Sequence, residues 1–169
     1  MDLILVKADI TTLDVDCIVN AANSKLMAGS GVCGAIHKAA GRELEIESIK
    51  LGPIKAGEAV ITPGFKLKAK HIIHTVGPIY REYSEHLQAE KLLASCFKES
   101  LRLAHSKQSQ SIAFPAISTG VYGYPKKEAA QVAIQAVKES LSNYSLSQVI
   151  FCVFDDENHS IYKDLLSIP

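Results

Sequence analysis

The 169-residue sequence predicts a layered α/β domain. Short apolar segments typical of strands alternate with amphipathic helical segments along the chain, which is the order found in layered α/β folds. Two glycine-rich loops each connect the end of an apolar strand to the start of a helix. No linker interrupts the pattern, so residues 1–169 are expected to form a single domain, long enough to bury about two thirds of the surface of the unfolded chain.

The elements follow from the spacing of apolar residues and from the positions of Gly and Pro. Strands are expected near residues 2–8, 16–20, 58–62, 71–76, 111–115 and 148–154. Helices are expected over residues 31–41, 42–51, 84–105, 126–141 and 157–166. Gly41 separates the first two helices, and the long helices place apolar residues at helical spacing, so each should bury one face against the sheet. Turns or exposed edges are expected at 52–57 and 63–70.

Composition limits the kinds of partner. The 18 Lys and Arg residues balance the 18 Asp and Glu residues, which argues against a broad nucleic-acid surface. No apolar run approaches the roughly 20 residues of a membrane span, and the first residues indicate a strand rather than a secretory signal. We therefore expect a cytoplasmic monomer with no nucleic-acid or membrane partner.

Cysteine and histidine spacing gives no metal site. The 4 cysteines form no C-x-x-C pair and have no histidine at zinc-binding spacing, so reduced thiols are expected. His71 and His74 alternate along a predicted strand, and no histidine pair has the companion carboxylate of a metal site. We expect no metal and no cofactor.

The first glycine loop lies in Asp16–Gly41, D-C-I-V-N-A-A-N-S-K-L-M-A-G-S-G-V-C-G-A-I-H-K-A-A-G. An apolar strand leads into two asparagines, then into a loop with glycines, then into a helix of small residues. Glycines let the backbone approach a ligand, and the free N–H groups of a helix start point at negative charge. This order of residues predicts an anion-binding cradle.

The second glycine loop has the same physical logic in Ala113–Pro125, A-F-P-A-I-S-T-G-V-Y-G-Y-P. Pro125 marks the start of the next helix, because its fixed φ and missing N–H suit the first helical turn. Two loops that each join a strand end to a helix start can hold one bridging anion between them. A diphosphate fits that description.

Together these blocks resemble the macrodomain family, whose members bind ADP-ribose. The resemblance covers nearly the whole chain, with further blocks V-K-A-D-I-T at 6–11, H-T-V-G-P at 74–78 and F-D-D at 154–156. Several ordered blocks at compatible spacing are far more specific than one glycine-rich loop. The resemblance implies a three-layer α/β/α sandwich around a mixed, mostly parallel six-stranded sheet. Both glycine loops would then lie at the carboxyl ends of the strands, where such sheets bind ligands.

The resemblance also implies the residues that hold the ligand. Asp9 and the Ile10 N–H would contact adenine, although an aspartate at this position also suits turn capping. Phe154 would pack on the adenine face, although a phenylalanine at a strand end is usually core.

The residues implied around the diphosphate are Gly31, Val32, Ser118, Thr119, Gly120, Val121 and Tyr122. The alternative is two helix N-termini without a ligand, which explains single glycines but not the paired loops. Tyr122 would also lie beside the distal ribose, whereas Tyr124 is expected to pack on the scaffold.

The residue implied at the distal ribose is Asn23, which matches the asparagine that hydrogen-bonds this sugar in the family. Asn20 is expected to hold the loop through local backbone bonds. Cys33 departs from the family pattern, since hydrolytic macrodomains of the bacterial and mitochondrial type usually carry G-V-D-G where this chain has G-V-C-G. The G-V-C sequence also resembles the alphavirus branch of mono-ADP-ribosyl hydrolases. A Cys33 thiolate nucleophile is the alternative, because helix N-termini lower the pKa of a thiol, but no histidine is assignable as its base.

The resemblance implies an ADP-ribose-binding hydrolase. Its substrates would be mono-ADP-ribosylated acidic side chains of proteins, O-acetyl-ADP-ribose, or both. Asn23 and Cys33 are then the candidate catalytic residues. The alternative is a reader of ADP-ribosylated proteins without turnover, which the absence of the aspartate at position 33 favours. An RNA or poly(ADP-ribose) binder is disfavoured by the zero net charge.

Overall fold

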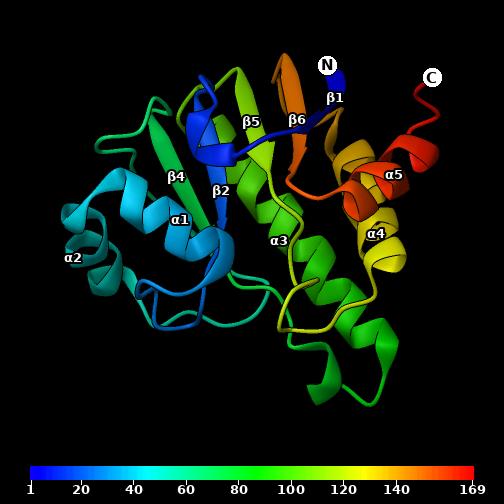
Figure 1. Cartoon of the computed structure of the whole chain (residues 1–169), viewed down its shortest axis with the longest axis horizontal. Helices are drawn as coiled ribbons and strands as arrows, with labels where there is room; N and C mark the ends of the chain where they lie inside the picture. The colour runs from blue at the N-terminus through cyan, green and yellow to red at the C-terminus, as the bar shows by residue number, and fades with distance from the viewer.

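The computed structural model describes all 169 residues as alternating strands and helices around one sheet (Figure 1). The strands are β1 (Asp2–Lys7), β2 (Cys17–Ala21), β3 (Ala59–Pro63), β4 (His71–Thr75), β5 (Ser111–Phe114) and β6 (Gln148–Val153). The helices are α1 (Gly31–Ala40), α2 (Arg42–Leu51), α3 (His86–Ser106), α4 (Lys126–Ser140) and α5 (Asp156–Leu165), with the 3₁₀ turns η1 (Ile10–Thr12) and η2 (Tyr80–Glu82). These elements confirm the predicted ones to within a few residues at their ends.

The sheet is mixed and mostly parallel, as predicted. Its 6 strands lie in the order β1-β6-β5-β2-β4-β3, and only β3 runs antiparallel to its neighbour. The carboxyl ends of β1, β6, β5 and β2 therefore lie side by side along one edge. In open parallel sheets this edge is where ligands bind.

Alternation along the strands produces the three layers. In β2, Cys17 and Val19 pack in the larger hydrophobic core, whereas Ile18 between them packs in the second core. The larger core is completed by residues of α3, α4 and α5, and the second by residues of α1, α2 and η1. Helices thus cover both faces of the sheet (Figure 1), and the three-layer α/β/α sandwich is confirmed. None of the helices combines the length and the hydrophobicity that a bilayer-spanning segment needs.

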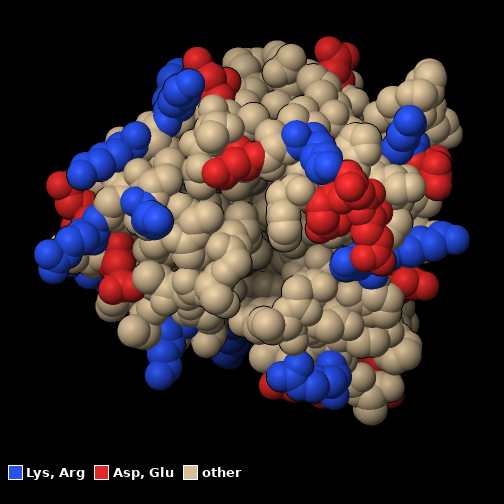
Figure 2. All heavy atoms as spheres, viewed as in Figure 1, with Lys and Arg blue, Asp and Glu red and all other residues tan.

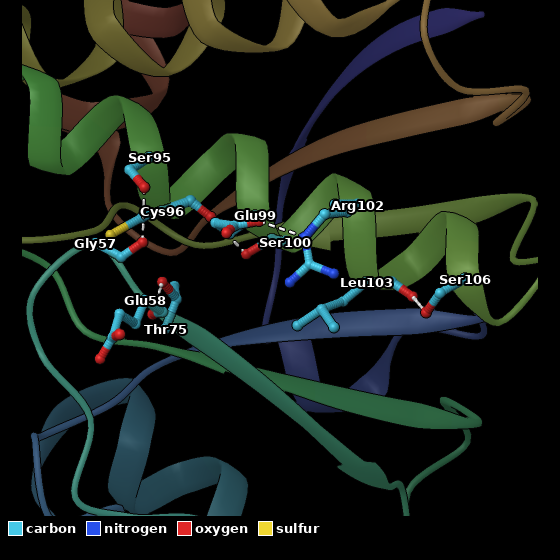
Figure 3. A network of polar contacts seen from close by, with 10 residues as sticks. All are labelled: Gly57, Glu58, Thr75, Ser95, Cys96, Glu99, Ser100, Arg102, Leu103 and Ser106. Carbon is cyan, nitrogen blue, oxygen red and sulfur yellow. Dashed lines mark hydrogen bonds and ion pairs between the residues drawn. The ribbon is translucent and has the colours of Figure 1, made fainter.

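Polar contacts hold the end of β4 and the loop before β3 against α3 (Figure 3). Ser95 Oγ of α3 donates to the Gly57 carbonyl at 2.8 Å, and Thr75 Oγ1 donates to the Glu58 carbonyl at 2.9 Å. Cys96 Sγ of α3 donates to the Val76 carbonyl at 3.3 Å. The start of the segment that follows β4 is therefore held against α3. Pro78 in the same segment contacts Ser118 of the second glycine loop.

Asp16 ties the amino end of β2 to its neighbours. Its carboxylate accepts from the Gln110 N–H at 2.7 Å and pairs with Lys70 Nζ at 3.2 Å. The Gln110 N–H and then the Lys70 ammonium hold the pKa of Asp16 below its usual value, against the opposing effect of partial burial. Because the folded pKa is lowered, the ionised form stabilises the fold above the unfolded pKa, and this contribution is lost as the pH falls through the folded pKa.

We expect Asp16→Asn to lower the free energy of unfolding at pH 7 by about 1 kcal/mol, the difference between a hydrogen bond to a charged group and one to a neutral group. Urea denaturation of both proteins at several pH values measures this difference. It should shrink towards zero as the pH falls through the lowered folded pKa of Asp16, because the protonated carboxyl is neutral like the amide. A difference that stays constant down to pH 2 would contradict the assignment.

Candidate functional site

The predicted site residues meet along the carboxyl edge of the sheet. Asp9 and Ile10 follow β1, Phe154 follows β6, the 118–122 segment follows β5, and Asn23 follows β2. Because these four strands are neighbours in the order β1-β6-β5-β2, the residues form one row. Figure 2 shows a hollow on this face, between the segment that follows β2 and the segment that follows β5 in Figure 1.

Both glycine loops present backbone N–H groups that have no acceptor within the protein. They are those of Gly31, Val32 and Cys33 in the first loop and of Thr119, Gly120, Val121 and Tyr122 in the second. The N-cap residue of α1, Ser30, makes no capping hydrogen bond with its side chain, so the first turn of this helix stays open to an external acceptor. This arrangement can hold an anion from two sides.

The second loop is held in shape by the segment after β4. Ser118 has a φ of 67°, and its Oγ donates to the Pro78 carbonyl at 2.9 Å. A Cβ on Gly77 would lie 2.1 Å from Ser118 Oγ, so only glycine allows this approach. The Tyr124 N–H returns to the Ser118 carbonyl at 2.9 Å, and the Tyr124 side chain is buried, which confirms its expected scaffold role. The H-T-V-G-P block thus supports the loop and does not itself line the row of site residues.

The two glycine loops lie next to one another, because β2 and β5, which they follow, are parallel neighbours in the sheet. Partial burial raises the pKa of Tyr122, and the next largest contribution comes from Cys33 in the first loop. Val121 is 81% exposed, and its carbonyl accepts from Arg81 of η2 at 3.2 Å.

The other end of the row carries Asp9 and Phe154. Asp9 Oδ1 accepts from the Thr11 N–H at 2.9 Å and from Thr11 Oγ1 at 2.7 Å, so the turn-capping role is formed. Oδ2 of Asp9 and the Ile10 N–H bond no other group of the protein and are free for a ligand. Phe154 is 77% exposed rather than part of the core. An exposed aromatic ring beside a free carboxylate oxygen and a free N–H can stack on a flat base and hydrogen-bond its edge.

The two asparagines have contacts other than those expected. Asn23, not Asn20, bonds the local backbone: its Nδ2 donates to the Met27 carbonyl at 2.8 Å, and its Oδ1 accepts from the Met27 N–H at 3.1 Å. Asn20 is fully buried, and its Nδ2 bonds His74 Nδ1 at 3.1 Å and Cys33 Sγ at 3.8 Å. The prediction for Asn20 was wrong because Asn20 lies inside β2, where its backbone is already paired and its side chain points to the α1 layer. Asn23 keeps a second N–H and a second lone pair for a ligand.

Helix α2 fixes the rest of the first loop from outside. Glu45 accepts from the Ala28 N–H at 2.5 Å, and Ser48 Oγ donates to the Leu26 carbonyl at 2.7 Å. From the other side, a Cβ on Gly34 would lie only 2.4 Å from the Gly29 carbonyl oxygen. The loop is thus clamped between α2 and the first turn of α1.

Cys33 is a buried thiol, 5% exposed, at the first turn of α1. Burial raises the pKa of the Cys33 thiol, and this effect outweighs the hydrogen bond from Asn20. The thiol therefore stays protonated near neutral pH, which contradicts the alternative of a thiolate nucleophile.

His37, one turn further along α1, hydrogen-bonds nothing with its ring, and burial lowers its pKa. No group of three or more His, Cys, Asp and Glu side chains is arranged to hold a metal ion.

Sequence reasoning treated His74 only as a strand histidine outside any metal site, and it did not single out Thr62. The period of two along β4 places His74 on the same face as the core residue Ile72, which signals a polar group in a buried layer. Its hydrogen-bond partners are Thr62, 12 positions before it in sequence, and Asn20, 54 positions before it. Only the strand register brings them together.

The comparisons with known proteins agree with this geometry. A family model described as Macro domain matches residues 19–133. The chain is 50% identical over 169 residues to the O-acetyl-ADP-ribose deacetylase of Salmonella gallinarum, covering 96% of this chain and 93% of that protein. A mutant macrodomain of Oceanobacillus iheyensis, solved with ADPR, superposes with a TM-score of 0.91 at 43% identity, covering 96% of this chain and 90% of that one. The Trypanosoma brucei macrodomain in complex with ADP-ribose gives a TM-score of 0.89 at 33% identity, covering 97% of this chain and 68% of that one. By its sequence, its fold and its relatives, this chain belongs to the Macro domain family.

Proposed function

We propose that this protein binds ADP-ribose along the carboxyl edge of the sheet and hydrolyses acyl esters at the distal ribose. The substrates are O-acetyl-ADP-ribose and mono-ADP-ribosylated acidic side chains of proteins. The observation that carries the proposal is the pair of neighbouring loops whose N–H groups have no acceptor in the protein. Relatives solved with ADP-ribose and a relative named O-acetyl-ADP-ribose deacetylase support it.

The order of the residues along the row fits the parts of the ligand. Adenine would stack on Phe154, with its edge bonded by Asp9 Oδ2 and the Ile10 N–H. The diphosphate would accept from the N–H groups of the 31–33 and 119–122 segments, and the distal ribose would reach Asn23 and Tyr122. Each hydrogen bond to a charged phosphate is worth about 1.5–3 kcal/mol, so the two loops together supply much of the affinity.

Water would be the nucleophile, and no side chain of this site is a general base. The Cys33 thiol is protonated, and a general base is typically worth a factor of about 10² to 10⁴ in rate. The rate acceleration would then come from positioning. The phosphate of the substrate and the loop N–H groups would hold the water near the reacting bond, and Asn23 would hold the ribose there. Well-oriented reactants of this kind gain large effective concentrations.

The test measures release of acetate from O-acetyl-ADP-ribose and of ADP-ribose from a protein modified on glutamate. We expect turnover by the wild type and a loss of about 10²-fold in Asn23→Ala, because the ribose is then free to shift by about 1 Å. Asn143→Ala, on an exposed loop, is the matched control and should keep wild-type activity. Cys33→Asp supplies a carboxylate beside the loop and should raise turnover.

Binding of ADP-ribose without release of either product would mean that the protein is a reader of ADP-ribosylated proteins and not an enzyme. The reader is favoured by the protonated thiol at position 33, and titration calorimetry with ADP-ribose and AMP detects its binding independently of turnover. Release from only one substrate would limit the proposal to that ester. Equal affinity for AMP and ADP-ribose would contradict a role for Asn23 and Tyr122 at the distal ribose.

A further inference from the structure

A line of buried polar side chains crosses the sheet beneath the first glycine loop. Asn20 of β2 and His74 of β4 are paired in register, and both are fully buried. His74 Nε2 lies 2.9 Å from Thr62 Oγ1 of β3, and His74 Nδ1 lies 3.1 Å from Asn20 Nδ2. Three adjacent strands thus contribute one polar group each to the face that α1 covers. The mechanism proposed above makes no use of His74 or Thr62.

The line continues from Asn20 to the loop. Asn20 Nδ2 also reaches Cys33 Sγ at 3.8 Å, and Cys33 Sγ donates to the Met27 carbonyl at 3.6 Å. The same carbonyl accepts from Asn23 Nδ2 at 2.8 Å. Gly29 lies between the two ends, since a Cβ there would be 3.4 Å from Asn23 Nδ2 and 3.5 Å from Cys33 Sγ. The chain of contacts therefore ends on the amide of Asn23.

The direction of each hydrogen bond follows from the proton of Cys33. A thiol has one proton, and Cys33 directs it to the Met27 carbonyl, so the Asn20 atom that faces Sγ must be a donor. This donor is Nδ2, and it faces His74 Nδ1, which must then accept. His74 consequently carries its proton on Nε2 and donates to Thr62 Oγ1. Burial lowers the pKa of His74 to about 3, so the ring stays neutral near pH 7.

We propose that His74 is a positioning residue for the distal-ribose end of the site. Its Nε2–H tautomer fixes the Asn20 amide, which orients Cys33, and Cys33 together with the Met27 carbonyl sets the place of Asn23. This inference rests on the proposed function of Asn23. It assigns no contact between His74 and the ligand. A purely apolar side chain at position 74 would fill the core equally well but would leave Asn20 without its acceptor.

The first test is the tautomer, which needs no ligand. ¹⁵N NMR of histidine-labelled wild-type protein should show His74 Nδ1 as an unprotonated nitrogen and Nε2 as protonated. A proton on Nδ1 would overturn the proposal, because Asn20 would then have to present its oxygen. This measurement is independent of whether the protein hydrolyses anything.

The second test is His74→Leu, which removes both hydrogen bonds and keeps an apolar side chain of moderate size. We expect a shift of the Asn23 side-chain amide resonances, a fall of about tenfold or more in ADP-ribose affinity relative to AMP affinity, and a fall in kcat of about 10²-fold with a smaller change in KM. AMP serves as the internal reference because it lacks the distal ribose. His74→Asn, whose Oδ1 can accept from Asn20, should restore most of the loss. His105→Leu on the exposed side of α3 is the matched control.

If His74→Leu does not fold, Thr62→Val makes a smaller change at the far end of the line. It removes the acceptor for Nε2–H while keeping the shape of the side chain, and the same three measurements should move in the same direction. An unchanged ratio of ADP-ribose to AMP affinity in a folded variant would overturn the positioning role. If the wild type binds ADP-ribose but releases no product, the hydrolase proposal fails, while the affinity ratio still decides on His74.

Discussion

Replacing Gly34 with alanine is expected to weaken ADP-ribose binding by about 10- to 100-fold. The new Cβ would lie 2.4 Å from the Gly29 carbonyl oxygen and 3.4 Å from its carbon. The atoms in the way are backbone, so no rotamer change relieves the clash and the loop itself must move. Loss of one or more hydrogen bonds to a charged phosphate, at about 1.5–3 kcal/mol each, accounts for the expected factor. Titration calorimetry with ADP-ribose measures it.

The matched control for Gly34→Ala is Ala35→Gly on the same turn of α1. Ala35 is exposed, so this change lowers helix stability by about 1 kcal/mol without reaching the loop. We expect Ala35→Gly to melt at a lower temperature and still bind, whereas Gly34→Ala loses binding even where its helix becomes intrinsically more stable. Wild-type affinity in Gly34→Ala would show that the loop has another arrangement with the same free N–H groups.

The strands and helices could be predicted because each depends on local pattern, whereas the residues expected to hold the ligand came from the resemblance to the macrodomain family. The resemblance placed Phe154 against a ligand rather than in the core, and the side chain is exposed. Asp9, Asn23 and the 118–122 segment each follow a strand, so a parallel sheet brings them to one edge whatever the fine packing. The position of a residue just after a parallel strand is thus enough to place it at this edge.

Partners across the sheet could not be predicted in the same way. An asparagine in a strand and one in the loop after it have the same residue type, and only tertiary placement decides that Asn20 meets His74 while Asn23 meets the Met27 backbone. The φ of 67° at Ser118 gives no sequence signal either, since glycine is the usual residue at such a position. It occurs together with the hydrogen bond from Ser118 Oγ to the Pro78 carbonyl, a contact between residues 40 positions apart.

Phe114→Ala is expected to have the largest effect on stability. Phe114 ends β5 in the middle of the sheet, is fully buried, and its ring centroid lies 4.8 Å from that of Phe97 in α3 and 6.5 Å from that of Phe151 in β6. Removing the ring should lower the free energy of unfolding by about 3–5 kcal/mol, which combines lost burial with a cavity between two layers. For a chain of this length that corresponds to a fall in melting temperature of roughly 6–20 °C. Urea denaturation with an unchanged m-value checks it, and Phe114→Leu should cost much less.

The same variant separates stability from binding. Phe114 precedes the second glycine loop, but the shape of that loop depends on Ser118, Pro78 and Gly77 rather than on the aromatic cluster. Well below its melting temperature, Phe114→Ala should therefore bind ADP-ribose within a few-fold of the wild type. A large loss of affinity in the folded variant would mean that the aromatic core sets the loop N–H groups directly. The Ser118 to Pro78 contact would then be a consequence of the loop shape and not its cause.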